Sequence, residues 1–165
     1  MSDAIHNTIP AFTRGAWESG EIVTRIGGGG IGGKAAGLWR LKTDLLGELD
    51  PLELPGLRGT IPRLGVLGTD VFDAFLEMNG LRELALSGAA DARIGQAFLK
   101  ATLPPEFLGD LRDCIAQVDE PLAVRSSSLL EDALDHPFAG VYATKMIPNN
   151  QTDTDSRFRA LDTAI

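Results

Sequence analysis

Residues 21–38 read EIVTRIGGGGIGGKAAGL, and this stretch determines the fold at the start of the chain. The β-branched residues of 21–26 predict a short strand. The glycine run at 27–33 cannot form stable regular structure by itself and predicts a loop. From Lys34 onward, apolar residues recur about every 3.6 residues, which predicts a helix over 34–47. A strand, a glycine loop and a helix in this order can bind phosphate through backbone N–H groups, and Lys34 adds a full positive charge.

Three interpretations of the glycine loop stay open on these residues alone. Residues 28–33 match the dinucleotide pattern GxGxxG, but so glycine-rich a run satisfies it easily and no ribose-binding acid follows cleanly. Residues 28–34 match GxxxxGK, but Ala35 stands where a P-loop NTPase needs Ser or Thr to hold magnesium. The third interpretation is a flexible linker or helix-entry loop that binds no ligand.

The remaining chain alternates strand and helix patterns. We expect a two-layer α+β fold in which the later strands share one mostly antiparallel sheet backed by helices. Residues 1–20 lack a pattern and are predicted to form an N-terminal arm or an edge segment, before a domain over 21–165. The expected later elements are strands at 61–67, 122–125 and 138–147, a helix over 70–78 capped by Thr69, a helix over 91–101, a helix starting at Pro104 and Pro105, and a last helix capped by Asp155.

Composition limits the classes of function. Fifteen basic and 23 acidic residues give a formal net charge of −8, which disfavours nucleic acid as a partner but permits a nucleotide held by local cations. Cys114 is the single cysteine, so no intrachain disulfide forms, and no apolar run approaches the length of a membrane span. The first residues show no signal peptide. We therefore expect a cytoplasmic protein without a membrane partner.

A second group of polar residues follows the predicted strand at 122–125. Residues 121–128 read PLAVRSSS, so Arg125 ends an apolar strand and three hydroxyls follow it. The fork of donors on Arg125 suits phosphate oxygens, and serines such as Ser126 can bind phosphate as well. The alternative is structural: Arg125 pairs with Glu131 or Asp132. His136 lies in a turn without a surrounding set of metal ligands, so we expect no metal site there.

Three segments carry a resemblance to a known family. Residues 31–38, IGGKAAGL, are similar to its GGK-x-x-x-L segment, and residues 61–69, IPRLGVLGT, are similar to its second strand. Residues 123–128, AVRSSS, with Glu131-Asp132 and the FAG at 138–140, resemble its VRSSA-x-x-ED…FAG block. In this order the segments resemble the N-terminal ATP-binding domain of the phosphoenolpyruvate synthase and pyruvate phosphate dikinase family.

The resemblance implies the first half of an ATP-grasp-type domain and a set of nucleotide-binding residues. Lys34 and Arg125 match positions that would neutralise phosphates, and Gly140 and Thr144 match positions along the nucleotide. Gly33 and Ser126 complete the expected site from the glycine loop and the serine run. The cofactor implied is ATP with magnesium, whose acidic ligands are expected beyond Ile165.

The function implied is that of a phosphotransferase, a kinase that passes a phosphoryl group from ATP to a histidine on a separate domain. His136 does not match that histidine, and the last helix meets the chain end without a stop signal. We therefore expect a truncated domain, inactive alone, whose partners are ATP and later domains of the same polypeptide. Residues 128–130, SLL, and 135–137, DHP, depart from the family pattern. The alternatives are a non-catalytic nucleotide-binding or regulatory module and, more weakly, a P-loop NTPase.

Overall fold

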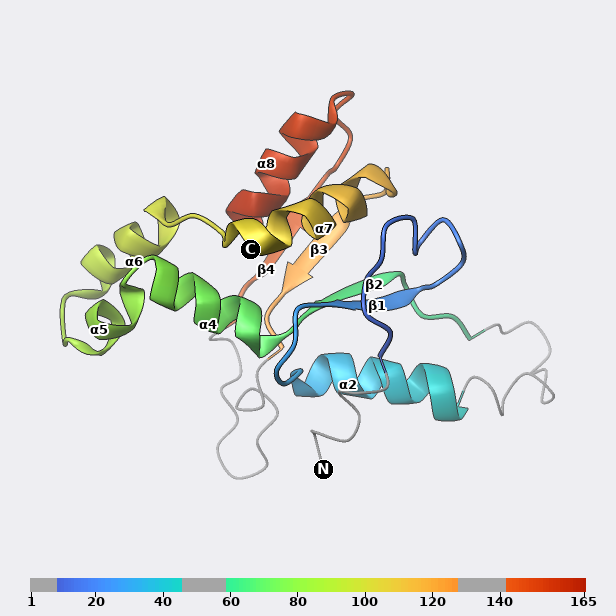
Figure 1. Cartoon of the computed structure of the whole chain (residues 1–165), viewed down its shortest axis with the longest axis horizontal. Coiled ribbons are helices and arrows are strands. Elements are labelled where there is room, and N and C mark those ends of the chain that lie inside the picture. Colours follow the sequence, from blue (N-terminus) through green and yellow to red (C-terminus); the bar gives the residue numbers. More distant parts are fainter. Residues whose placement is uncertain (1–8, 46–58, 128–141) are drawn as a thin grey trace.

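The structure, a computed structural model, describes residues 9–45, 59–127 and 142–165 (Figure 1). Its mixture of helices and strands confirms the α+β class. In chain order the elements are β1 (Val23–Ile26), α2 (Gly33–Arg40), the π-helical turn η1 (Leu41–Leu45), β2 (Leu64–Leu67), α4 (Thr69–Met78), α5 (Leu81–Leu86), α6 (Asp91–Lys100), α7 (Pro105–Ala116), β3 (Leu122–Arg125), β4 (Thr144–Ile147) and α8 (Thr154–Ala164).

The strands form two separate two-stranded sheets within the described ranges. β1 pairs with β2 in parallel, and β3 pairs with β4 in antiparallel. The expectation that the strands near 61–67, 122–125 and 138–147 share one mostly antiparallel sheet is therefore corrected. The connection gives the reason: α2 lies between β1 and β2 along the chain, and a helical crossover of this kind joins parallel strands.

Both faces of the β1–β2 pair are covered by helices. α2 lies against one face, and α7 crosses the other (Figure 1). Burial raises the pKa of the Cys114 thiol on α7 to about 12, with Asp113 and Asp110 adding to the effect, so this side chain stays neutral in the core. The buried residues on the α2 side are Ile9, Val23, Ile31, Ala35, Trp39 and Val66. Those on the α7 side include Phe12, Trp17, Ile26, Leu111, Ile115, Val118, Ile147, Phe158 and Leu161.

The segment at 9–20 belongs to this core. Ile9, Phe12 and Trp17 are buried, and the Trp17 indole N–H donates to the Thr24 hydroxyl at 2.9 Å. A parallel bridge between Ala11 and Arg25 lies beside β1. Of the two interpretations offered by the sequence, these residues fit an edge segment and not a loose arm, because their apolar side chains fill space against β1.

The predicted helices are present, with corrections at their ends. Helix α4 begins at Thr69 and its N-cap residue is Gly68, so the Thr69 hydroxyl does not cap it. Helix α8 is capped by Asp153, which accepts a hydrogen bond from the Ser156 N–H at 2.7 Å, and not by Asp155. The Ser156 N–H lowers the pKa of the Asp153 carboxyl. Local patterns thus located the helices, while their first residues and caps differ by one or two positions from those expected.

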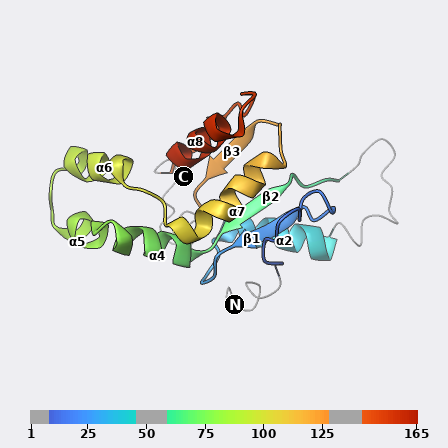
Figure 2. The same ribbon diagram turned by 45° about the horizontal axis from the view of Figure 1, so that its top comes forward.

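Helices α5 and α6 project to one side of the molecule (Figure 2). Sequence patterns did not predict α5, a short element between Gly80 and Ser87, and α6 has no buried residue. The rings of Phe75 on α4 and Phe98 on α6 lie 6.0 Å apart and tie this projection to the body. No helix in the described ranges is long and apolar enough to cross a membrane.

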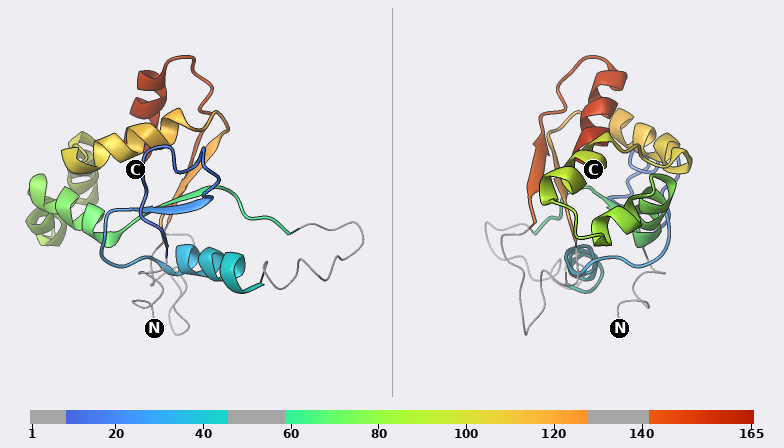
Figure 3. Two further views of the ribbon diagram at one scale, coloured as in Figure 1. Left: turned by 45° about the vertical axis from the view of Figure 1, so that its right-hand side comes forward. Right: turned by 90° about the vertical axis from the view of Figure 1, so that its left-hand side faces the viewer.

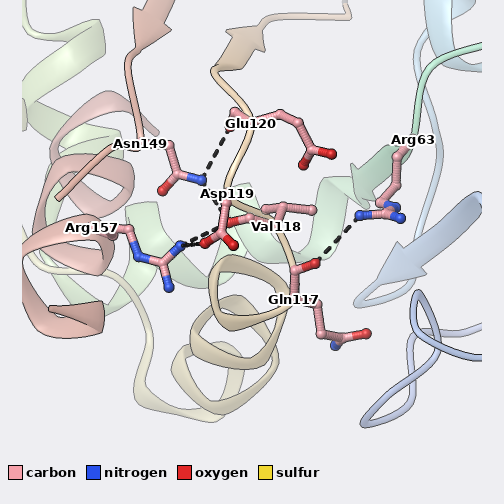
Figure 4. Close-up of polar contacts among 7 residues, drawn as sticks. All are labelled: Arg63, Gln117, Val118, Asp119, Glu120, Asn149 and Arg157. Atoms are coloured by element: carbon pink, nitrogen blue, oxygen red, sulfur yellow. Dashed lines mark hydrogen bonds and ion pairs between the residues drawn. The ribbon is translucent and has the colours of Figure 1, made fainter. Parts of the chain in front are cut away.

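The turn between α7 and β3 is held from several directions (Figure 4). Asn149, after β4, donates its amide to the carbonyl of Val118 at 2.8 Å and to that of Glu120 at 3.1 Å. Arg157 on α8 donates to the Val118 carbonyl at 2.9 Å and to the Asp119 carboxylate at 2.6 Å. These bonds hold α8 next to the turn that follows α7, and α7 and α8 lie side by side in both views of Figure 3.

Asn149 makes a testable contribution to stability. It is 1% exposed and has a positive φ of 52°, which alanine adopts poorly. Replacing Asn149 by Ala removes one buried and one part-buried hydrogen bond and strains the backbone, so we expect a loss of about 2–4 kcal/mol. The free energy of unfolding in urea measures this loss.

Asn150→Ala is the matched control, because Asn150 is the next residue and is exposed. Asn149→Gly should lose less than Asn149→Ala, since glycine tolerates the positive φ. Equal stability of the Asn149→Ala and Asn150→Ala variants would contradict the role assigned to this side chain.

Candidate functional site

The first half of the glycine loop is attached to the start of α4. The Gly28 N–H donates to the Asp70 carboxylate at 2.5 Å, and the Gly30 N–H donates to the Thr69 hydroxyl at 2.8 Å. The Thr69 N–H returns a bond to the Gly30 carbonyl at 3.0 Å. Two loop N–H groups are therefore used within the protein and do not face a ligand.

Close packing explains much of the glycine content of this half. Gly27 and Gly29 have positive φ values of 76° and 71°. A Cβ at Gly27 would lie 2.5 Å from an Asp70 carboxylate oxygen, and one at Gly29 would lie 2.5 Å from the Thr69 hydroxyl. Glycine is required here both by backbone conformation and by lack of space.

The second half of the loop packs against the chain that follows β3. A Cβ at Gly32 would lie 1.2 Å from the Ser127 carbonyl oxygen, so no other residue fits without a shift of the backbone. The Ser127 hydroxyl also accepts a hydrogen bond from the Ala35 N–H at 3.2 Å. The N-cap Gly32 offers α2 no side-chain cap, and Ser127 satisfies one of its first N–H groups instead.

This contact brings two groups of predicted site residues into one region. Gly33 and Lys34 form the first turn of α2, and Lys34 is half-buried. Arg125 ends β3 opposite Thr144, the first residue of β4, and both are exposed. Ser126 follows Arg125 and is exposed. The end of β3 thus reaches the start of α2, as Figure 1 shows.

Comparison with known protein families shows to which family the chain belongs. Residues 29–164 match the family described as pyruvate phosphate dikinase, AMP/ATP-binding domain. The chain belongs to this family. The match runs from the glycine loop to the end of α8 and confirms the resemblance carried by the sequence motifs. Comparisons with curated proteins and with solved structures gave no match.

Several expectations for this AMP/ATP-binding domain fall outside the described residues. They concern Gly140 as a nucleotide residue, Glu131 or Asp132 as partners of Arg125, and His136 as a turn residue. A concave surface shared by the Lys34 and Arg125 side chains also stays a prediction. The contact between Gly32 and Ser127 joins the backbone segments that carry these two cations.

Sequence reasoning missed the residues that hold the loop of this AMP/ATP-binding domain. Arg25 donates from its guanidinium to the Gly27 carbonyl at 2.7 Å. Thr69 was predicted as a helix cap, and its hydroxyl instead serves Gly30. The serine run was a visible signal for Ser127, whereas no local pattern pointed to Asp70, because its partner is 42 residues away along the chain.

The described part of this domain holds no cluster of metal-ligand side chains. In the ranges 9–45, 59–127 and 142–165, no three His, Cys, Asp or Glu side chains lie close enough to hold a metal ion. A surface hollow lies at the opposite end of α4 from the glycine loop. Its lining holds Glu77 and Glu83 beside Arg82, which pairs with Asp73, so the charge of this lining disfavours a polyphosphate.

The close contact at Gly32 predicts a sharp difference between two glycines. Gly32→Ala should force the loop away from Ser127 and destabilise the fold by about 1–3 kcal/mol. Gly37 lies on α2, and a Cβ added there would have no neighbouring atom within 4 Å, so Gly37→Ala should be neutral or stabilise by about 0.5–1 kcal/mol. Thermal unfolding of both variants measures the difference, and equal melting temperatures would contradict the contact.

Proposed function

We propose that this chain is the ATP-binding portion of a phosphotransferase resembling phosphoenolpyruvate synthase and pyruvate phosphate dikinase. The observation that carries the proposal is the contact between Gly32 and Ser127, because it brings the start of α2 beside the end of β3. In this arrangement Gly33 and Lys34 meet the phosphates from one side and Arg125 from the other. The domain would be the first half of an ATP-grasp-type fold.

Charge and hydrogen bonding support this assignment. A triphosphate needs local cations in a protein whose formal net charge is −8. The first turn of a helix offers N–H groups and partial positive charge, and Lys34 lies in that turn. Arg125 is exposed at the end of β3, and the planar fork of donors on its guanidinium suits phosphate oxygens.

Ser126 and Thr144 would complete the site. Ser126 follows Arg125, and Thr144 is opposite Arg125 across the β3–β4 pair, so their hydroxyls belong to the same exposed strand end. Gly140 would approach the nucleotide from the segment before β4. Magnesium would neutralise the phosphates through ligands that lie outside the described residues.

The reaction proposed is transfer of a phosphoryl group from ATP to a histidine on another domain of the same polypeptide, in the cytoplasm. The residues of this chain would bind and orient ATP and stabilise the charge on its phosphates. A non-catalytic nucleotide-binding or regulatory module is the second candidate, favoured by the departures from the family pattern at residues 128–130, SLL, and 135–137, DHP. A P-loop NTPase is less favoured, because the Gly28 and Gly30 N–H groups bind Asp70 and Thr69.

Calorimetric titration of the full-length protein with ATP and magnesium, beside a phosphate-release assay, separates these candidates. Binding with turnover supports the phosphotransferase, and binding without turnover supports the regulatory module. No binding of ATP would contradict the proposed function itself.

Arg125 gives the sharpest test of the site. A charge-assisted contact with phosphate contributes about 1.5–3 kcal/mol, so Arg125→Ala should weaken ATP binding by about ten- to a hundredfold. Arg125→Lys should restore only part of the affinity, because the planar fork of donors is lost. Titration calorimetry on the full-length variants measures both effects.

Arg82→Ala is the matched control for this test. Arg82 is an exposed arginine on α5 that pairs with Asp73 at 2.7 Å, far along the chain from the site. Its removal should leave ATP affinity unchanged. If Arg125→Ala lowers the melting temperature while the affinity of the folded protein for ATP is kept, Arg125 has a structural role and not a binding role.

A further inference from the structure

Two side chains at the start of α4 hold the glycine loop from outside the nucleotide site. We propose that Thr69 and Asp70 are positioning residues: they fix Gly28 and Gly30, and thereby hold the segment 31–34 in the geometry that binds phosphate. This inference rests on the proposed function, and it assigns neither side chain a contact with the nucleotide.

The hydrogen bonds support this role directly. The loop between β1 and α2 spans residues 27–32, and two of its N–H groups end on Thr69 and Asp70. The Thr69 N–H bonds back to the Gly30 carbonyl, and the Gly68 N–H donates to the Ile26 carbonyl at 3.0 Å. The loop is therefore attached to the β2–α4 connection at both ends of its glycine-rich half.

The other end of the loop is fixed separately. Ile31 is 3% exposed in the core beneath α2, and Gly32 packs on the Ser127 carbonyl. Ile31 and Gly32 connect Gly30 to Gly33 and Lys34, so a loop released at Gly28 and Gly30 loses one of the two attachments that hold the first turn of α2. Since a site must hold its ligand groups within about half an ångström, a loosened loop should lower affinity without removing any phosphate contact.

The negative charge of Asp70 distinguishes a positioning role from an electrostatic attraction between this side chain and the ligand. A carboxylate near a phosphate site repels the ligand, so Asp70 cannot favour ATP by its charge. Its place at the first turn of α4 stabilises the carboxylate, and its oxygen accepts from the Gly28 N–H. A carboxylate is useful at this position because it accepts the Gly28 N–H. Its negative charge gives no such advantage, since it repels phosphate.

The test compares, at each position, a variant that removes the hydrogen-bond acceptor with one that keeps it. The measurements use the full-length protein, with ATP and magnesium as the titrant. Thr69→Val keeps the shape and removes the acceptor, while Thr69→Ser keeps the acceptor. Asp70→Ala removes the acceptor, while Asp70→Asn keeps an oxygen and removes the charge. We expect the Val and Ala variants to bind ATP about five- to tenfold more weakly, the Ser variant to bind as the wild type does, and the Asn variant to bind at least as tightly because it keeps the acceptor and loses the repelling charge.

The control carboxylate lies on the same helix. Asp73 is exposed and pairs with Arg82, so Asp73→Ala removes the same charge as Asp70→Ala without touching the loop, and it should leave ATP affinity unchanged. Hydrogen exchange of the Gly28 and Gly30 amides without nucleotide should be faster in Thr69→Val and Asp70→Ala. Thr69 is exposed, so Thr69→Val carries the test if Asp70→Ala does not fold.

Each outcome decides one claim. Wild-type affinity in the Val and Ala variants would overturn the positioning role while leaving the proposed function intact. Equal weakening in the Ser and Asn variants would also overturn it, because the acceptor would then not be what matters. Failure of the wild-type protein to bind ATP would overturn the proposed function, and this inference with it.

Discussion

The structure depends on the close approach of Gly32 to the Ser127 carbonyl, where no Cβ fits. On one side of this contact are the parallel strands β1 and β2 with α2, and on the other is the antiparallel pair of β3 and β4. The hydrogen bond from the Ala35 N–H to Ser127 continues the same contact into the first turn of α2. A bulkier residue at position 32 would separate the glycine loop from the end of β3, and would thereby move Lys34 away from Arg125.

The glycine loop shows why a structural and a binding interpretation are not exclusive. Its first half is a packed element: Gly27 and Gly29 have positive φ and no room for a Cβ, and the Gly28 and Gly30 N–H groups are bonded to α4. Only its second half, where α2 begins, has the geometry in which backbone N–H groups face outward from a helix start. Counting glycines therefore overestimates how much of such a loop is available for phosphate.

Local patterns in the sequence predicted most helices and strands, since apolar periodicity and turn residues act over a few positions. The pairing of strands was not predictable in this way. β2 follows β1 through α2, and the crossover makes that pair parallel, whereas residues 61–67 alone are compatible with either direction. Within the candidate site, Lys34 and Arg125 could be identified from the sequence because both are cations that follow a glycine run or end a strand pattern. Asp70 could not, because its function lies in one hydrogen bond to Gly28 across 42 positions.

An acidic chain can serve a polyphosphate ligand because affinity depends on the local field and not on the sum of charges. Arg25 and Lys34 lie at the two ends of the glycine loop, Arg125 ends β3, and Asp70 is bonded to Gly28. The Asp70 carboxylate accepts a backbone N–H and lies in the first turn of α4, where the helix dipole offsets its charge. Its repulsion of a phosphate is thereby reduced while its acceptor function is kept. The field at this loop therefore depends on how the Asp70 carboxylate is bonded as well as on the cations of Arg25, Lys34 and Arg125.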